Sequence, residues 1–224
     1  MIAKLILRII FGISLIGSLL FVAAGSFAWP GAWVFLTIFA SMGLGGGAWL
    51  ARADPGLFKE RMAPPIQRGQ KRWDQVLMSV LLIIWLGWFV LMGLDFRFGW
   101  SSVPVWAQVV GAGLLGLTAY SAFLTVRANR FAAPVVKIQK DRGHIVITTG
   151  PYAYVRHPMY AGAIFYAVGA PLLLGSLYGL LVSALLILLL GLRAVLEERT
   201  LAAELEGYVD YAARVRYRFV PFVW

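Results

Sequence analysis

Two short segments in the last third of the chain carry residue types that could perform polar chemistry. The first reads Arg-His-Pro-Met-Tyr-Ala-Gly and runs from Arg156 to Gly162. Pro158 suits the first turn of a helix, so His157 is expected at the mouth of that helix, where free backbone N–H groups and the helix dipole favour an anion. The alternative is a loop that ends on a membrane helix, with Arg156 as an interfacial charge and the tyrosines in an interfacial belt. Residue types alone leave both interpretations open.

The second segment pairs Arg193 with Glu197, four residues apart on one face of a helix, and Glu198 follows directly. One interpretation is a surface ion pair, which stabilises a helix by only about 0.2–0.5 kcal/mol. However, the pair lies where an apolar hairpin that begins at His157 leaves the bilayer. A carboxylate buried there is costly unless it binds something, and this favours a functional role.

The tail of the chain is rich in aromatic and basic residues. This composition is typical of interfacial anchoring, and the arginines could equally bind anionic lipid headgroups. The residues concerned are Tyr208, Tyr211, Arg214, Arg216, Tyr217 and Arg218.

The overall composition is that of a membrane protein, with 61% hydrophobic and only 13% charged residues among 224. The chain has no cysteine and two histidines, His144 and His157, and no spacing typical of a metal site, so no metal is expected. A net charge of +10 could indicate nucleic-acid binding, but the charges lie in loops between apolar blocks, and we expect no nucleic-acid partner.

Apolar blocks predict the elements that must position these residues. Residues 9–51 lack any charge and are long enough for two membrane passes, with a turn at Trp29–Gly31. Blocks 75–94 and 98–126 each predict one pass. Block 157–192 is interrupted at 175–179 and predicts a helical hairpin whose arms are each short for a full span. From Arg193 onward, the leucines at 196, 201 and 205 predict a separate amphipathic cytosolic helix.

The predicted fold is therefore all-α and polytopic. It has about five to six membrane helices, including the C-terminal hairpin, and the cytosolic amphipathic helix. Residues 1–126 would form four N-terminal passes, and residues 127–224 a C-terminal region of loop, hairpin, amphipathic helix and tail. Residues 1–28 resemble a signal peptide, but we expect them to be retained as the first helix.

The distribution of basic residues predicts the orientation. Loop 52–75 carries six basic and three acidic residues, and loop 127–157 carries six basic residues against Asp141 alone. By the positive-inside rule both loops and both termini are cytoplasmic. We expect an integral membrane protein of the bacterial inner membrane.

Together, these features resemble the isoprenylcysteine carboxyl methyltransferase family and the related membrane phospholipid N-methyltransferases. The family hallmark is an Arg-His-Pro-x-Tyr-x-Gly segment, then a helical hairpin, a Glu-Glu pair and a tyrosine-spaced stretch before a proline. In this chain these are Arg156–Gly162, Glu197 with Glu198, Tyr208, Tyr211 and Pro221. The resemblance covers roughly residues 130–224.

The resemblance implies S-adenosylmethionine as the cofactor, bound at the cytosolic face. It places Arg193 toward the acceptor and offers His157 and Glu198 as bases should the acceptor be an amine or a thiol. Lys137 lies where some relatives have a polar cofactor contact. The implied cofactor-binding residues are His144, Ile145, Val146, Ile147, Tyr152, His157, Pro158, Met159, Tyr160 and Glu197.

The implied function is methyl transfer to a lipophilic or membrane-associated acceptor, whose methylated group is a carboxylate, a thiol or an amine. Such a small-molecule or lipid substrate would enter sideways from the bilayer, between the hairpin and its neighbours. Membrane lipid is the other expected partner, and the oligomeric state stays open. The alternatives are an NADPH-dependent membrane reductase of the sterol-reductase type and a non-enzymatic membrane scaffold or transporter subunit, although few charges lie inside the predicted spans.

Overall fold

The computed structural model describes residues 2–64, 66–67 and 69–224, and every regular element within these ranges is helical. Arg68, one of the basic residues counted above, lies outside them. Five helices are long and apolar enough to cross a membrane, and a sixth, α6, is apolar but shorter, so the all-α polytopic prediction is confirmed. The helices are α1 (Ile2–Ala24), α2 (Pro30–Ala53), α3 (Pro55–Arg61), α4 (Arg72–Phe98), α5 (Val105–Ala128), α6 (Pro158–Leu174), α7 (Leu177–Glu204) and α8 (Tyr208–Arg214).

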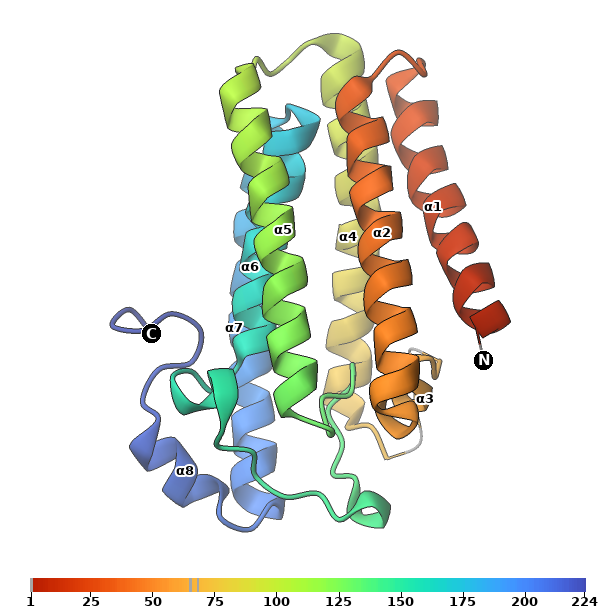
Figure 1. Cartoon of the computed structure of the whole chain (residues 1–224). Helices are drawn as coiled ribbons and strands as arrows, with labels where there is room; N and C mark the ends of the chain where they lie inside the picture. The colour runs from red at the N-terminus through yellow and green to blue at the C-terminus, as the bar shows by residue number, and fades with distance from the viewer. Residues whose placement is uncertain (1, 65, 68) are drawn as a thin grey trace.

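The long helices run alongside one another as a bundle (Figure 1). The turns after α1, α4 and α6 lie at one end of the bundle. The N-terminus, α3, α8 and the long loop between α5 and α6 lie at the other end. The two basic loops therefore share one end of the molecule, as the charge pattern predicts.

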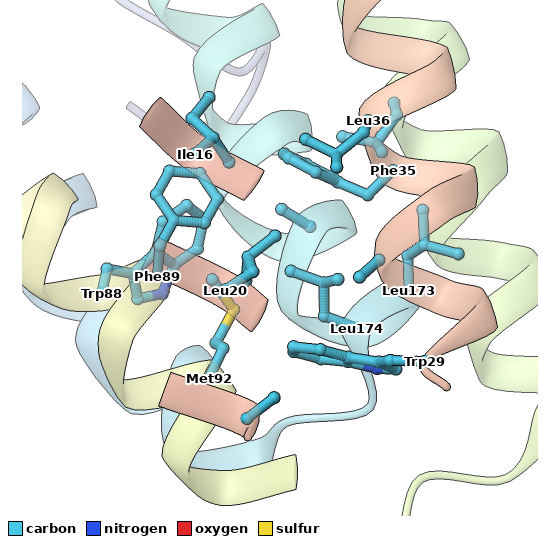
Figure 2. Close-up of a cluster of buried hydrophobic side chains, with 14 of the residues drawn as sticks. Ile16, Leu20, Trp29, Phe35, Leu36, Trp88, Phe89, Met92, Leu173 and Leu174 are labelled. Carbon is cyan, nitrogen blue, oxygen red and sulfur yellow. The ribbon is translucent and has the colours of Figure 1, made fainter. Parts of the chain in front are cut away.

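Large apolar side chains fill the centre of the bundle. Trp88, Phe89 and Met92 of α4 meet Leu20 of α1 and Phe35 of α2 in one buried cluster (Figure 2). The indole N–H of Trp88 also donates to the carbonyl of Gly179 on α7 over 2.7 Å. This cluster fixes α4 between α1 and α7, and both the α4–α7 and the α5–α6 contacts cross the predicted boundary at residue 126.

Helices α5 and α6 pack closely because glycines face each other across the contact. A Cβ on Gly111 would lie 2.5 Å from the backbone nitrogen of Leu173 and 2.7 Å from the carbonyl oxygen of Gly169. A Cβ on Gly169 would in turn lie 2.8 Å from the carbonyl oxygen of Gly111. Small residues let membrane helices approach to backbone contact, so these two glycines close the space between α5 and α6.

The structure corrects two details of the predicted C-terminal region. Helix α7 runs for 28 residues from Leu177 to Glu204, so its arm of the hairpin is long enough to span, and only α6, with 17 residues, is short. The segment after Arg193 continues α7 and is not a separate amphipathic helix. The change from apolar to charged residues at 193 alters the solvent preference of the helix but contains no glycine or proline that would end it. The helix ends near Gly207, which has a left-handed φ of 79°.

Candidate active site

A cavity lies at the end of the bundle that carries α3 and α8. Its walls come from the loop after α5, the first turn of α6, the last three turns of α7 and helix α8, and its volume is about 160 Å³. Ligand pockets commonly measure about 300–1,000 Å³, so the walls must move apart to admit a cofactor-sized ligand. The main lining residues are Phe131–Lys137, His144–Ile147, Tyr152, Arg156–Tyr160, Arg193, Glu197, Leu201, Leu205, Tyr208 and Tyr211.

The structure brings almost all of the predicted site residues into this one cavity. The strip His144–Ile147, Tyr152, the segment His157–Tyr160, and both Arg193 and Glu197 contribute to the lining. Glu198 lies behind His157, outside the lining that the described residues form. Segments that are 50 residues apart in the sequence therefore converge as the resemblance implies.

Glu197 and Tyr160 form the polar centre of the cavity. The Tyr160 hydroxyl donates to Oε2 of Glu197 over 2.5 Å and accepts from Nη1 of Arg193 over 2.7 Å. Pro158 starts α6 two residues before Tyr160, with His157 as the residue that precedes the helix, so Tyr160 lies in the first turn. The hydroxyl thus fixes the carboxylate of Glu197 at the cavity wall.

Arg193 points away from Glu197 and toward α4. Its Nε donates to Oδ1 of Asp74 over 2.8 Å, and its Nη2 donates to the carbonyl of Pro134 over 3.0 Å. The side chain is only 7% exposed, so the arginine is held in the bundle by partners on three segments. Asp74, not Glu197, is the carboxylate that pairs with Arg193.

Glu198 contacts three cationic or ionisable side chains. Its Oε1 accepts from Nε of Arg156 over 2.7 Å and lies 3.1 Å from Nε2 of His157, and its Oε2 accepts from Nε of Arg218 over 3.0 Å. Both carboxylate oxygens are therefore engaged. Glu198 holds the histidine segment against the tail of the chain.

The tail closes the side of the site beside His157. The backbone N–H groups of Arg156 and His157 donate to the carbonyls of Tyr217 and Arg218, each over 2.9 Å. The ring of Phe219 stands edge-on to the His157 and Tyr160 rings, which stack in parallel at 5.2 Å. The stacked pair is thus sandwiched between the cavity and the tail.

Helix α8 adds a tyrosine wall. The Tyr211 hydroxyl donates to the carbonyl of Tyr152 over 2.8 Å, and the amide of Asn129 donates to the Tyr152 hydroxyl over 2.9 Å. Burial raises the pKa of Tyr211 to about 12 and raises the pKa values of Tyr152 and Tyr208 further, so all three hydroxyls keep their protons at neutral pH. The buried Tyr208 hydroxyl has no hydrogen-bond partner among the described residues, and it lines the cavity.

His144 lies on the opposite wall in its neutral form. Its Nδ1 accepts a long hydrogen bond of 3.3 Å from the backbone N–H of Gln139, and its ring packs on Phe131 at 4.6 Å. Burial, and secondly the positive charge of Arg142, lower the pKa of His144 below its ordinary value of 6.5.

The sequence-based prediction missed two contributors to the site. The loop segment Phe131–Val136, which consists of apolar residues, lines the cavity, and no motif marks it. Asp74 is fully buried behind the wall, in a part of the chain that was expected to supply only membrane passes. Lys137, predicted from the sequence as a possible polar contact, lines the cavity and binds Glu60 over 2.5 Å and Gln67 over 2.9 Å.

Comparison with known proteins places the site within a matched region. Residues 106–205, just under half of the chain, match the family model described as phospholipid methyltransferase. The chain is also similar, over part of its length, to enzymes named protein-S-isoprenylcysteine O-methyltransferase. The resemblance predicted from the sequence is confirmed.

These similarities cover only part of each protein. The relative from Schizosaccharomyces pombe is 33% identical over 81 residues, which are 36% of this chain and 34% of the relative. The relative from Saccharomyces cerevisiae is 32% identical over 78 residues, or 34% and 33% of the two chains. The Arabidopsis thaliana enzyme, form B, is 29% identical over 100 residues, or 44% and 50%. The chain thus spans a third to a half of the length of these relatives.

Proposed function

We propose that this membrane protein transfers a methyl group from S-adenosylmethionine to a lipophilic acceptor. The observation that carries the proposal is the 2.5 Å contact between the Tyr160 hydroxyl and the Glu197 carboxylate. It joins the Arg156–Gly162 segment to the Glu-Glu pair in one cavity, and both segments lie within the region that matches the methyltransferase family model.

The residues of the cavity fit the polar and apolar parts of S-adenosylmethionine. When bound, this cofactor supplies an electrophilic methyl group on a sulfonium. Glu197 offers a carboxylate for an amino group or for ribose hydroxyls, and the Tyr208 hydroxyl, which has no partner among the described residues, can donate to the ligand. The apolar strip Ile145–Ile147 suits an adenine ring, and tyrosine faces attract a sulfonium by cation–π interaction.

The chain's own residues position and desolvate the reacting groups. Methyl transfer is a displacement that gains most from orientation and exclusion of water, and a cavity whose walls close around the ligand supplies both. A carboxylate acceptor needs no base. For an amine or thiol acceptor, His157 is a candidate base at the cavity wall, whereas both oxygens of Glu198 are already engaged by donors.

An apolar groove beside the site supports a lipophilic acceptor. It has a volume of about 440 Å³, and it lies between α7 and the tail, lined by Ile187, Leu188, Gly191, Leu192, Val195, Phe219 and Trp224. Phe219 contacts both His157 and Tyr160, so the groove and the cavity share a wall. Because α5 and α6 are in backbone contact, the face of α7 is the better route for the acceptor to enter from the bilayer. We assign the acceptor's hydrocarbon part to this groove.

The proposal also covers the side of the membrane on which the site lies and the reactive group of the acceptor. The basic loops favour a site at the cytoplasmic face with both termini on that side, and we propose that the membrane is a bacterial inner membrane. The relatives' name favours the carboxylate of a prenylated cysteine, with an amine and a thiol as the other candidates. The boundary near residue 126 would separate a supporting bundle from the methyltransferase-like region.

Calorimetric titration tests the cofactor. The detergent-purified protein is titrated with S-adenosylmethionine, S-adenosylhomocysteine and NADPH, beside the variant Glu197→Ala and the control Glu206→Ala, an exposed glutamate just beyond α7. We expect micromolar binding of the two adenosyl compounds that is lost in Glu197→Ala and retained in the control. Binding of NADPH alone would identify a reductase instead, and no binding of any of the three would favour a scaffold.

A further inference from the structure

The carboxylate of Asp74 is buried within the bundle, yet it faces the rear of the candidate site. It lies in the first turn of α4 and has no exposed surface. Its Oδ1 accepts from Nε of Arg193 over 2.8 Å. Its Oδ2 accepts from the side-chain amide of Gln70 and from the backbone N–H of Val136, each over 2.9 Å. Both oxygens are thus used, and all of the partners lie at the cavity end of the molecule.

The contacts continue from Asp74 to the polar centre of the cavity. Arg193 donates onward to the Tyr160 hydroxyl over 2.7 Å, and that hydroxyl donates to Glu197 over 2.5 Å. Arg193 also lies over the Tyr160 ring, 5.5 Å from its centroid. An aspartate in α4 therefore reaches the cofactor-facing carboxylate through two intermediate side chains. None of these contacts exposes Asp74 itself to the cavity.

The direction of the Tyr160 hydroxyl follows from the charge of Asp74. A guanidinium has donors in a rigid planar fork, so the pairing of Nε with Asp74 sets where Nη1 points. Because Nη1 donates to the Tyr160 oxygen, the hydroxyl proton is directed to its remaining neighbour, Glu197. Without Asp74, the buried guanidinium would turn to the nearest other carboxylate, and Glu197 is the one it would reach on the same face of α7.

We propose that Asp74 is a positioning residue for cofactor binding, which keeps Arg193 away from Glu197 and so leaves the Glu197 carboxylate free for the ligand. This inference rests on the proposed function. It also means that an N-terminal helix contributes to the site, although α4 lies outside the region that matches the family model. The simpler alternative is that Asp74 only stabilises the start of α4 and its contact with α7.

A matched pair of variants separates positioning from stability. Asp95 is the other buried carboxylate of α4 in the described part of the chain, 1% exposed, and it binds Ser101 and Ser176 at the opposite end of the bundle. The full-length protein is purified in detergent as wild type, Asp74→Asn and Asp95→Asn. Calorimetry gives the Kd for S-adenosylhomocysteine, and thermal unfolding gives the midpoint for each.

The expected result is a change in affinity that follows Asp74 alone. Asp74→Asn should raise the Kd about tenfold or more, while Asp95→Asn should leave it within about twofold, although both lower the thermal midpoint. Equal changes in Kd for the two variants, or no change for Asp74→Asn, would overturn the inference. Wild-type protein that binds no adenosyl ligand would overturn the proposed function, and with it this inference.

A double-mutant cycle tests the route through Arg193. If Asp74 acts by holding the Arg193 guanidinium away from Glu197, Asp74→Asn should change the Kd by less than about twofold in an Arg193→Met background, where no guanidinium can turn to Glu197. A full tenfold effect in that background would overturn the route. Should Asp74→Asn fail to fold, Arg193→Lys takes its place, because lysine can pair with Asp74 but lacks the fork that reaches Tyr160. An unchanged Kd in Arg193→Lys would then contradict the proposal.

Discussion

At the scale of single residues, adjacent glutamates of α7 differ in what they contact. Glu197 faces the cavity and receives the Tyr160 hydroxyl, whereas Glu198 binds Arg156 and Arg218 and lies close to His157. Neighbouring positions on a helix are separated by about 100°, so the two side chains must face different partners. The geometry therefore favours a ligand-binding role for Glu197 and a structural role for Glu198.

The Tyr160 hydroxyl should contribute to cofactor affinity. Tyr160→Phe leaves Nη1 of Arg193 and the Glu197 carboxylate without their shared partner, and an unpaired buried polar group costs about 1–3 kcal/mol. We expect the Kd for S-adenosylhomocysteine to rise about fivefold to a hundredfold in calorimetry. Tyr166→Phe, in the core-facing part of the same helix, is the control and should bind as the wild type does.

The neutral state of His144 predicts a pH dependence of stability. Since its pKa in the folded protein lies below the ordinary value of 6.5, the unfolded chain binds the proton more readily, and acidification destabilises the folded form. The thermal midpoint of the wild type, measured relative to His144→Asn, should fall as the pH falls from about 7.5 to about 5.5. A relative midpoint that rises over this range would show that the folded protein stabilises the charged imidazole.

At the scale of elements, the site depends on how α6 is held between α5 and α7. The α5–α6 contact is made by backbone against backbone at Gly111 and Gly169, and α7 is fixed to α4 by Trp88 and by Asp74. The apolar pattern predicts these helices, but the continuous course of α7 through Arg193 was not expected. The hydropathy of the sequence changes at Arg193, but its helix propensity does not. The hydropathy change therefore predicts a new element where the helix continues.

The α5–α6 contact predicts a difference between two glycines of α5. Gly111→Ala places a methyl group 2.5 Å from the Leu173 nitrogen, and overpacking of this kind costs about 1–3 kcal/mol. Gly113→Ala meets no atom within 4 Å and removes a flexible residue from a helix. Thermal unfolding in detergent should show a clearly lower midpoint for Gly111→Ala and an equal or higher one for Gly113→Ala. An equal fall of the midpoint in both variants would show that α5 and α6 do not pack closely at Gly111.

At the scale of the whole molecule, the features that could be predicted are those specified by residues close together in the sequence. The Arg156–Gly162 segment and the Glu-Glu pair are recognisable because each is a short motif, and the apolar blocks predict the helices that join them. Asp74 could not be predicted, because its partner Arg193 is 119 positions away and a first-turn aspartate is also explained by the helix dipole. The loop Phe131–Val136 could not be predicted for another reason, since it is an irregular segment of apolar residues without a motif.

The most direct test of the account is transfer of an isotopically labelled methyl group. Membranes that contain the protein are incubated with labelled S-adenosylmethionine and, separately, a farnesylated cysteine, phosphatidylethanolamine and a long-chain alkyl thiol, beside membranes with Glu197→Ala. The account predicts label in at least one lipophilic product with the wild type, and a loss of about 100-fold or more with the variant, since binding and orientation of the cofactor are both lost. No transfer above the level of Glu197→Ala with any of the three acceptors, together with consumption of NADPH by the wild type, would contradict it.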